Sequence, residues 1–464
     1  MYLARAAEAL RPPRPTLQFW CWSAAWHGLW WLALMTAAGY WSMLADSTSQ
    51  IWWRDHLQWD AVWHLSIALD GYGLNPKTYA FPPGFGWLLR IVTDVEIQLR
   101  TLWSGQSLLE LSRDPNFDPR EIALRLAATI NLIAFYAGNT LATRLIAERF
   151  QLHPSRVLAA CLANPFAYFA MTAYSDPLYH LLFWLSLTLW FLRSPRGELW
   201  GFRPWASSSS RVRWLTRFGL SLSLFLAPWV RLNAYALLGL AAGTSLLTRH
   251  RPRLAEQLST RSSPQADTES TSRTKNEAEA APTEVSSATP LPLELTALIV
   301  SAVAFLLFNW IKTDRPFFFL LAQRVYGMPE GNFFDGFTRA MGMFYEGLSG
   351  DAWISTEIFL HWFSFGVLPL VFLLALLALA LQLYRHREWG LAAVVLLHVL
   401  ITHNQAIWRS TPRYAFPLVA LALSILLITQ SNTWRRVVFA LGLGLGWAMQ
   451  VSYYATFRVG GWGF

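Results

Sequence analysis

Residues 17–44 read LQFWCWSAAWHGLWWLALMTAAGYWSML and contain no acidic residue, lysine or arginine. The run is longer than the roughly 20 residues that a helix needs to cross a bilayer, and it also exceeds the apolar core of a signal peptide, so we expect a retained first membrane span. Comparable runs recur along the 464-residue chain, which is 54% hydrophobic. Long uninterrupted runs favour helices, because lipid offers the backbone no hydrogen-bond partner and barrel strands show short alternating segments instead. The sequence therefore predicts an all-α polytopic membrane protein.

Basic residues indicate how these helices are oriented. The formal net charge is +9, and the arginines cluster in short segments between the apolar runs. This distribution is typical of the positive-inside rule and differs from the basic face of a nucleic-acid-binding protein. If the arginine-rich N-terminus is cytoplasmic, residues 17–44 cross outward and residues 45–80 form an external loop. The basic stretch 193–217 then lies on the cytoplasmic side.

Alternation of apolar runs and basic loops predicts about eleven membrane spans. Residues 81–93 are apolar but short and contain Pro82, Pro83 and two glycines, so a re-entrant or interfacial segment is expected there. The polar residues 94–120 are expected to stay outside. The predicted spans are residues 17–44, 121–150, 157–173, 178–191, the two arms of a hairpin over 218–247, 291–311, 358–384, 389–402, 414–429 and 437–454.

The chain divides into two membrane halves joined by a polar segment. Residues 1–250 form the N-terminal transmembrane half with the external loop 45–80, and residues 291–464 form the C-terminal half with an external segment over 312–351. Residues 251–290 are rich in Ser, Thr, Glu, Ala and Pro and lack aromatic residues. Such a segment cannot bury enough apolar surface to order itself, so a disordered cytoplasmic linker is predicted.

One acidic residue of the first predicted external loop, Asp60, has a second titratable residue nearby. Asp60 and His64 are four residues apart, so on a helix both project along one face. A carboxylate that takes a proton from an attacking hydroxyl, beside an imidazole that tunes it or binds substrate, is a plausible general-base arrangement. The alternative is that Asp60 caps a short helix and that Trp59 belongs to an interfacial aromatic belt. Spacing alone favours the cap.

A second acid and a charge within an apolar segment add to this pattern. Asp176, in Tyr-Ser-Asp-Pro, is suited to hold a sugar hydroxyl or to support the base, although an Asp before Pro also starts turns and helices. Arg231 lies midway along the apolar segment 218–247, where a charge costs at least ~2.5 kcal/mol and marks a functional site or a buried pair. Its structural partner would be Asp60 or Asp176.

Arg409 and Arg413 lie four residues apart at a predicted outer membrane edge. Their guanidinium forks suit phosphate oxygens, as a lipid phosphate at the interface would require. The alternative is that they are interfacial anchors. No cluster of His, Cys or carboxylate residues has metal-ligand spacing, and no glycine-rich nucleotide loop is present, so neither a metal nor a soluble nucleotide cofactor is expected.

Five short motifs in order resemble those of the PIG-V-like mannosyltransferases, a family of the GT-C class that includes the second mannosyltransferase of GPI-anchor assembly. They are similar to the family's first-loop motif and to its Ala-Phe-Phe-Pro, Tyr-Ser-Glu-Ser, Arg-Ser-Asn-Gly and Pro-Arg-Tyr elements. The chain departs from the family at Asp176, which replaces Glu, and at Leu232 and Ala234, which interrupt Arg-Ser-Asn-Gly. The second Phe of Ala-Phe-Phe-Pro is also missing. The motifs are Trp59-Asp60 with Gly71-Tyr72, Tyr79-Ala80-Phe81-Pro82-Pro83, Tyr174-Ser175-Asp176, Trp229-Val230-Arg231-Leu232-Asn233 and Pro412-Arg413-Tyr414.

The resemblance implies a GT-C-like helical bundle with short external helices. It implies transfer of mannose, or a similar hexose, from a polyprenyl-phosphate donor to a lipid-linked or surface acceptor on the non-cytoplasmic face. Asp60 inherits the role of general base in an inverting displacement, and no metal is required if arginines neutralise the phosphate. The expected substrate-binding residues are Trp59, His64, Asp176, Arg231, Asn233, Arg409, Arg413 and Tyr414.

Two other classes of function compete with this interpretation. A transporter or flippase of a lipid-linked sugar would show internal repeats and polar groups near mid-membrane. A non-catalytic assembly subunit would leave Asp60, Arg231 and Arg413 without a shared cavity. The absence of any Asn-x-Ser/Thr acceptor or retrieval-type tail favours a bacterial plasma membrane over the endoplasmic reticulum.

Overall fold

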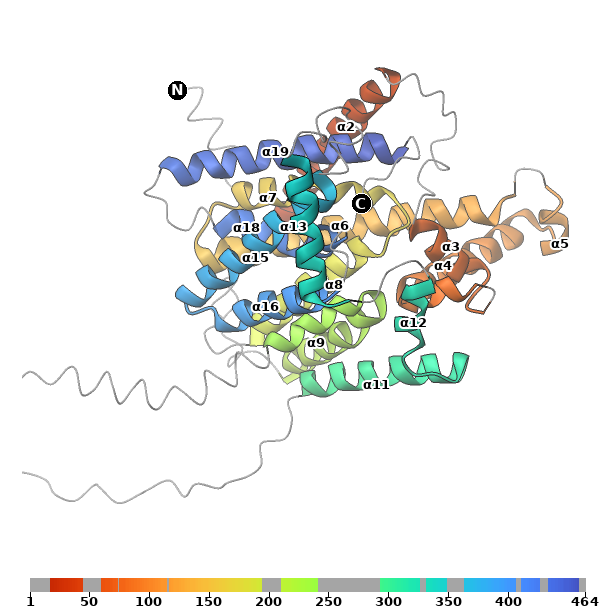
Figure 1. The fold of residues 1–464 in the computed structure, drawn as a ribbon. Coiled ribbons are helices and arrows are strands. Elements are labelled where there is room, and N and C mark those ends of the chain that lie inside the picture. Colours follow the sequence, from red (N-terminus) through yellow and green to blue (C-terminus); the bar gives the residue numbers. More distant parts are fainter. Residues whose placement is uncertain are drawn as a thin grey trace, which may run out of the picture.

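The computed structural model describes residues 17–44, 60–73, 75–114, 117–193, 210–240, 293–325, 331–348, 363–405, 410–425 and 433–458. Every regular element in these ranges is helical (Figure 1), which confirms the all-α class. Trp59, Arg409, the predicted linker 251–290 and the first part of the predicted external loop lie outside the described residues.

Long helices form the body of the molecule, and short helices connect them. The long ones are α2 (Leu17–Leu44), α4 (Pro83–Ser104), α6 (Pro119–Phe150), α8 (Asp176–Arg193), α9 (Ser210–Val230), α11 (Leu293–Thr313), α13 (Phe333–Leu348), α15 (Leu368–Arg385), α16 (Trp389–His403) and α19 (Thr433–Arg458). The short ones are α3 (Asp60–Leu69), η2 (Pro76–Ala80), α5 (Leu108–Leu111), α7 (Pro154–Leu162), η3 (Ala167–Met171), η5 (Leu232–Leu237), α12 (Phe318–Val325), η7 (Phe363–Val367), α17 (Thr411–Tyr414), η8 (Phe416–Leu418) and α18 (Val419–Ile425).

Within the described ranges, four helices have the length and apolar composition to cross a bilayer. They are Pro119–Phe150, Leu295–Thr313, Leu368–Arg385 and Thr433–Thr456. Together with the apolar composition of the chain, they indicate an integral membrane protein. The number of eleven spans stays a prediction.

Neighbouring helices in the bundle pack in the order of the chain. α6 packs on α8, α8 on α9 and α9 on α11, while α15 packs on α16. In Figure 1, α19 and α2 lie along one side of the bundle and α11 lies along the opposite side. Small residues permit close approach, as in many membrane bundles. A Cβ on Gly446 of α19 would come within 2.0 Å of the Ala163 carbonyl oxygen.

Buried polar side chains form hydrogen bonds between the helices. Such bonds matter in a membrane because helix association in lipid gains little from the hydrophobic effect. His27 on α2 lies 3.1 Å from the Asn139 amide nitrogen on α6, and the Asn139 oxygen lies 2.9 Å from Nε2 of His180 on α8. Gln450 on α19 accepts a hydrogen bond from Trp30 at 2.7 Å and donates to the backbone of Asn164 at 2.7 Å. These bonds connect α2, α6, α8 and α19 through the core.

The end of the bundle that holds the C-terminus of α6 carries basic residues. Arg149 forms an ion pair of 2.5 Å with Glu388, which precedes α16, and its guanidinium lies over the Phe191 ring near the end of α8. The ends of α6 and α8 and the turn between α15 and α16 therefore lie together. The side of the membrane that this end of the bundle faces stays a prediction.

Helix α4 is longer than the re-entrant segment predicted over residues 81–93. It continues for 22 residues to Ser104 and ends at Gly105, which adopts the left-handed conformation with φ of 67°. The charged continuation forms i,i+4 pairs, with 2.9 Å between Arg100 Nε and Glu96 Oε1 and 3.8 Å between Arg90 and Asp94. Such pairs stabilise an exposed helix, so α4 continues into the polar stretch that begins at residue 94. The external position of residues 94–120 stays a prediction.

The predicted span over residues 157–173 is broken. α7 is 9 residues long, and the 3₁₀ helix η3 follows it after Asn164 and Pro165. Proline lacks the amide that an α-helix needs and restrains the preceding residue, so the helix ends there. The Asn164 side chain instead donates to the Phe416 carbonyl at 2.8 Å.

The hairpin predicted over residues 218–247 also differs. α9 is a single 21-residue helix that begins at Ser210, so its first arm is about 31 Å long and not short. Arg231 follows its last residue in an extended conformation, with φ of −152° and ψ of 128°, and opens η5. The second arm beyond residue 240 lies outside the described residues.

Candidate active site

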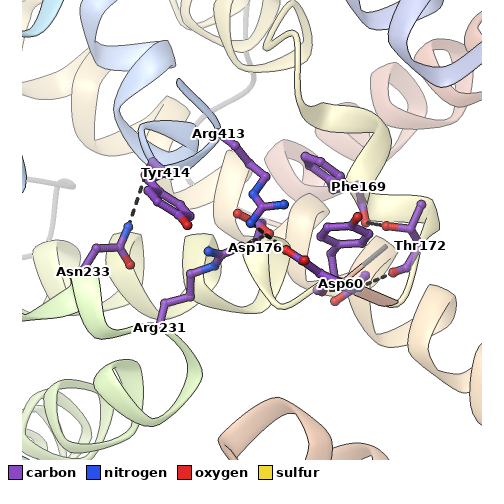
Figure 2. A network of polar contacts seen from close by, with 10 residues as sticks. Asp60, Phe169, Thr172, Asp176, Arg231, Asn233, Arg413 and Tyr414 are labelled. Atoms are coloured by element: carbon purple, nitrogen blue, oxygen red, sulfur yellow. Dashed lines mark hydrogen bonds and ion pairs between the residues drawn. The ribbon is translucent and has the colours of Figure 1, made fainter. Parts of the chain in front are cut away.

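Four charged residues from distant parts of the sequence converge where helices begin or end. Asp60 is the first residue of α3 and Asp176 the first of α8. Arg231 follows α9, and Arg413 lies in the four-residue helix α17. Figure 2 shows the charged ends of these four side chains close together. Because α8 and α9 pack together with Asp176 beside Arg231, they run antiparallel and bring both residues to one end of the helix pair.

Two ion pairs join these residues. Nη2 of Arg413 lies 2.7 Å from Oδ2 of Asp60, and Nη2 of Arg231 pairs with Oδ2 of Asp176. The side chains of Asp60 and Arg413 are 13% and 6% exposed, and those of Asp176 and Arg231 are 1% and 12% exposed. Removing one partner of such a pair leaves an uncompensated buried charge, which typically costs about 3–5 kcal/mol. Neither pair is a solvated surface contact.

Aromatic rings surround the guanidinium groups. Tyr414 lies next to both, since its ring centroid is 5.1 Å from the Arg231 guanidinium carbon and 5.4 Å from that of Arg413. Arg413 also lies over Phe169 at 5.7 Å and Tyr174 at 5.4 Å. Cations at these distances are attracted by the ring faces, most strongly away from water. The rings therefore hold the Arg413 side chain in addition to its ion pair.

The charges of the arginines keep Asp60 ionised. Burial would raise the pKa of Asp60, but Arg413, Arg231 and nearby His64 oppose burial and hold the pKa below its ordinary value. For Arg413, burial favours the neutral form, and Asp60 and Asp176 outweigh it, so its pKa is raised well above the usual value. The Asp60 carboxylate is therefore ionised and in direct contact with a permanently charged guanidinium group. A hydroxyl group that reached Asp60 would meet a base able to take its proton.

His64 lies one turn along the same buried face of α3, as the spacing predicted. Its ring packs edge-on against Phe81 at 5.3 Å and Phe85 at 5.2 Å. Burial, with Arg231 and Arg413 adding to it and Asp60 opposing, lowers the pKa of His64 to about 3. The imidazole is therefore neutral near pH 7 and is not a second charged group of the site.

Asn233 forms a hydrogen bond with the backbone of Tyr414, the aromatic residue next to both arginines. Its Nδ2 donates to the backbone carbonyl of Tyr414 at 3.3 Å, which links η5 to α17 (Figure 2). Within the described part of the chain, Oδ1 of Asn233 and Oδ1 of Asp176 have no hydrogen-bond partner. Both atoms are acceptors that a bound hydroxyl would satisfy.

The sequence did not single out Asn131 or Tyr174 as site residues. Asn131, fully buried in α6, donates through Nδ2 to the carbonyls of Thr172 at 2.5 Å and Tyr174 at 2.7 Å. It thereby holds the turn that leads into Asp176. An asparagine inside the apolar stretch 121–150, one of two there, was the available signal, because polar groups at such positions are costly and seldom without a role.

Glycine at position 84 lets α4 approach the end of α9. A Cβ on Gly84 would lie 2.7 Å from the Trp229 carbonyl oxygen, two residues before Arg231. The start of α4 and its contact with α9 explain the sequence Pro82-Pro83-Gly84. Pro83 starts α4, where its missing amide costs nothing, and Gly84 admits the neighbouring backbone.

Six of the predicted site residues lie together in the described structure, and His64 is one helical turn away. The six are Asp60, Asp176, Arg231, Asn233, Arg413 and Tyr414. Trp59 and Arg409 lie outside the described residues. In the ranges that the structure covers, no three His, Cys, Asp or Glu side chains gather as metal ligands would.

Comparison with known proteins supplies the class of enzyme. Residues 32–224 match the family described as mannosyltransferase (PIG-V). No curated protein and no solved structure gives a significant match. The chain is thus a glycosyltransferase, an enzyme that acts on a sugar donor and an acceptor at a membrane. Within that class, its residues 32–224 are similar to the PIG-V mannosyltransferases, the family that its motifs resemble.

The matched region contains Asp60, His64 and Asp176 but ends before Arg231, Asn233, Arg413 and Tyr414. The ion pairs connect the two sets. The aspartates of the matched segment therefore lie against arginines from the remainder of the chain.

Proposed function

We propose that this enzyme transfers mannose, or a similar hexose, from a polyprenyl-phosphate donor to a lipid-linked or surface acceptor on the non-cytoplasmic face of its membrane. The observation that carries the proposal is the buried contact of Asp60 with Arg413 beside the pair of Asp176 and Arg231. In the proposed reaction Asp60 is the base, and Arg413 and Arg231 are the phosphate ligands beside it.

Asp60 acts as the general base. It removes the proton from the acceptor hydroxyl while that oxygen attacks the anomeric carbon, so the transfer is a single displacement with inversion. A positioned base of this kind contributes about 10²–10⁴-fold to the rate. The low pKa of Asp60 keeps it in the ionised form that this step requires.

Arg231 and Arg413 stabilise the lipid phosphate as it leaves, and Arg409 is a third candidate for this role. Preorganised donors aimed at developing charge are often the largest contribution to catalysis, and guanidinium forks match phosphate oxygens. The rings of Tyr414, Tyr174 and Phe169 restrain Arg413 before the donor arrives.

Asp176 and Asn233 contact the sugar. Each presents a buried carbonyl or carboxylate oxygen that has no hydrogen-bond partner within the described residues. Trp59, His64 and Tyr414 complete the substrate-binding set, with His64 contributing as a neutral imidazole.

The donor's polyprenyl tail lies in the bilayer beside the site. Apolar side chains of α9 and α11, including Leu226 and Leu307, are exposed on the outside of the bundle, as lipid-facing residues would be. Because Arg149 and Glu388 mark the other end of α6 and α8, the site falls at the end opposite the basic residues. This position supports the non-cytoplasmic face. The preference for a bacterial plasma membrane over the endoplasmic reticulum rests on the sequence alone.

A transporter of lipid-linked sugars is the alternative, and one assay separates it from the transferase. The purified protein in lipid nanodiscs would be incubated with polyprenyl-phosphate mannose, glucose or galactose, each with and without acceptor lipid extract. The transferase releases polyprenyl phosphate in an acceptor-dependent way and uses one sugar preferentially. Movement of the intact donor between leaflets of a proteoliposome, without release of the lipid phosphate, would establish the transporter instead.

A further inference from the structure

Both arginines that the proposed function assigns to the phosphate are occupied by the protein's own carboxylates. Nη2 of Arg413 contacts Asp60 at 2.7 Å, and Nη2 of Arg231 contacts Asp176. Carboxylate and phosphate oxygens are alternative partners for the same guanidinium fork. A phosphate that binds here must therefore share the arginines with the aspartates or displace them.

We propose that Arg413 and Arg231 form an anion site that Asp60 and Asp176 occupy at rest, and that Arg413 passes from Asp60 to the lipid phosphate during transfer. The ligand class is a phosphate monoester or diester on a polyprenyl lipid. The inference rests on the proposed function and adds a second role to Arg413.

Charge balance explains why Arg413 passes from Asp60 to the lipid phosphate, a step called the hand-over below. Two aspartates and two arginines sum to zero, and the donor, a phosphodiester, adds one negative charge. In the transfer step the acceptor oxygen bonds to the anomeric carbon, and the bond from that carbon to the phosphate oxygen breaks with its electrons staying on the phosphate. The acceptor's proton moves to Asp60, so Asp60 becomes neutral as the phosphate becomes a dianion. The total stays at minus one, while the charge facing Arg413 moves from Asp60 to the leaving group.

Arg413 suits this exchange better than Arg231 does. Asp176 takes no proton in the reaction, so Arg231 keeps its carboxylate partner throughout. Arg413 is held over three aromatic rings, at 5.4 Å from Tyr174 and Tyr414 and 5.7 Å from Phe169. Its guanidinium therefore stays in place when Asp60 becomes neutral.

The test is binding of the product lipid phosphate, which does not require turnover. Full-length wild type and Asp60→Asn, both in nanodiscs, would be titrated with polyprenyl phosphate. Asp60→Asn has the shape and charge of the protonated base, so it should bind the lipid phosphate about tenfold more tightly. Inorganic phosphate as a competitor shows whether the headgroup alone is sufficient or the lipid is needed.

Matched variants isolate the exchange. Asp60→Glu keeps the charge and should not tighten binding, and Asp94→Asn removes an exposed acid of α4, 3.8 Å from Arg90, and should leave binding unchanged. The double variant with Asp60→Asn and Arg413→Gln should lose the tighter binding of polyprenyl phosphate. Thermal unfolding of each variant establishes that it is folded.

The outcomes separate this inference from the proposed function. Unchanged or weaker binding by folded Asp60→Asn, or a gain that survives Arg413→Gln, contradicts the hand-over even if the wild type transfers sugar. If Asp60→Asn binds polyprenyl phosphate more tightly but the wild type transfers no sugar, the anion site is supported and only the proposed transfer reaction is contradicted.

Discussion

Oδ2 of Asp60 lies 2.7 Å from Nη2 of Arg413, although one residue belongs to the first part of the chain and the other to the last. The contact joins the segment that matches the mannosyltransferase family to a helix outside that segment. It makes the base and the phosphate ligand of the proposed reaction direct neighbours, so changes at either residue should affect both proton removal and donor use.

Asp60→Asn should lower sugar transfer by about 10²–10⁴-fold, because the shape is kept and the proton acceptor is lost. The measurement is acceptor-dependent release of polyprenyl phosphate by purified protein, with Asp94→Asn as the control for removing an aspartate elsewhere. Turnover at the wild-type rate by Asp60→Asn would remove Asp60 from the role of base.

Arg231→Lys and Arg413→Lys should each reduce donor use by about 10²–10³-fold while the protein stays folded. Lysine keeps the positive charge but lacks the planar fork that meets two oxygens at once. Steady-state kinetics with varied donor test this, alongside thermal unfolding. An arginine whose lysine variant uses donor normally is a structural ion-pair residue.

Asn131→Leu should lower transfer by misplacing the turn that carries Tyr174 and Asp176. It leaves the carbonyls of Thr172 and Tyr174 without their donor, at a cost of about 1–3 kcal/mol for each buried group. Asn309→Leu is the matched control, since Asn309 bonds only to Phe305 of its own helix among the interactions described, at 2.9 Å. Equal losses of transfer in the two variants would mean that Asn131 has no special position in the site.

Gly84→Ala should impair transfer more than an alanine at an open glycine. Its Cβ would meet the Trp229 carbonyl oxygen at 2.7 Å and push the end of α9, and with it Arg231, away from α4. Overpacking of this kind costs about 1–3 kcal/mol. Gly444→Ala in α19 is the comparison, because nothing lies within 4 Å of its added Cβ. If both variants are equally active and stable, the close approach of α4 and α9 does not support the site.

The pH dependence of kcat/KM should show no inflection near 6.5 from this site. His64, with its pKa lowered to about 3, stays neutral until the pH falls through that value. Asp60, with its pKa below the ordinary range, loses its ionised form only as the pH falls through the lowered pKa. Activity should therefore be flat from about pH 5 to 8, where an unperturbed histidine would titrate. An acidic limb near 6.5 that disappears in His64→Asn would show that His64 is charged in catalysis.

Patterns of consecutive residues predicted much of the fold and the identity of the charged groups. The apolar runs indicated an all-α membrane protein, and α2, α6, α11, α16 and α19 fall close to their predicted ranges. The expectations that needed contacts between distant residues were less accurate. α7 ends early at Asn164 and Pro165 because proline cannot continue the helix, and the Asn164 side chain bonds to Phe416 from a distant part of the chain. α4 continues past Thr93 because its charges pair along the helix.

By itself, the sequence determined that this protein is a helical membrane glycosyltransferase with two conspicuous aspartates and several arginines near the ends of apolar segments. It left Arg231 with two possible partners, Asp60 or Asp176. Only the tertiary structure paired Arg231 with Asp176 and Asp60 with Arg413, and only it placed Asn131 behind the turn. Hydropathy depends on neighbours along the chain, whereas the energy of a buried charge depends on distances in space that the packing of α3, α8, α9 and α17 creates.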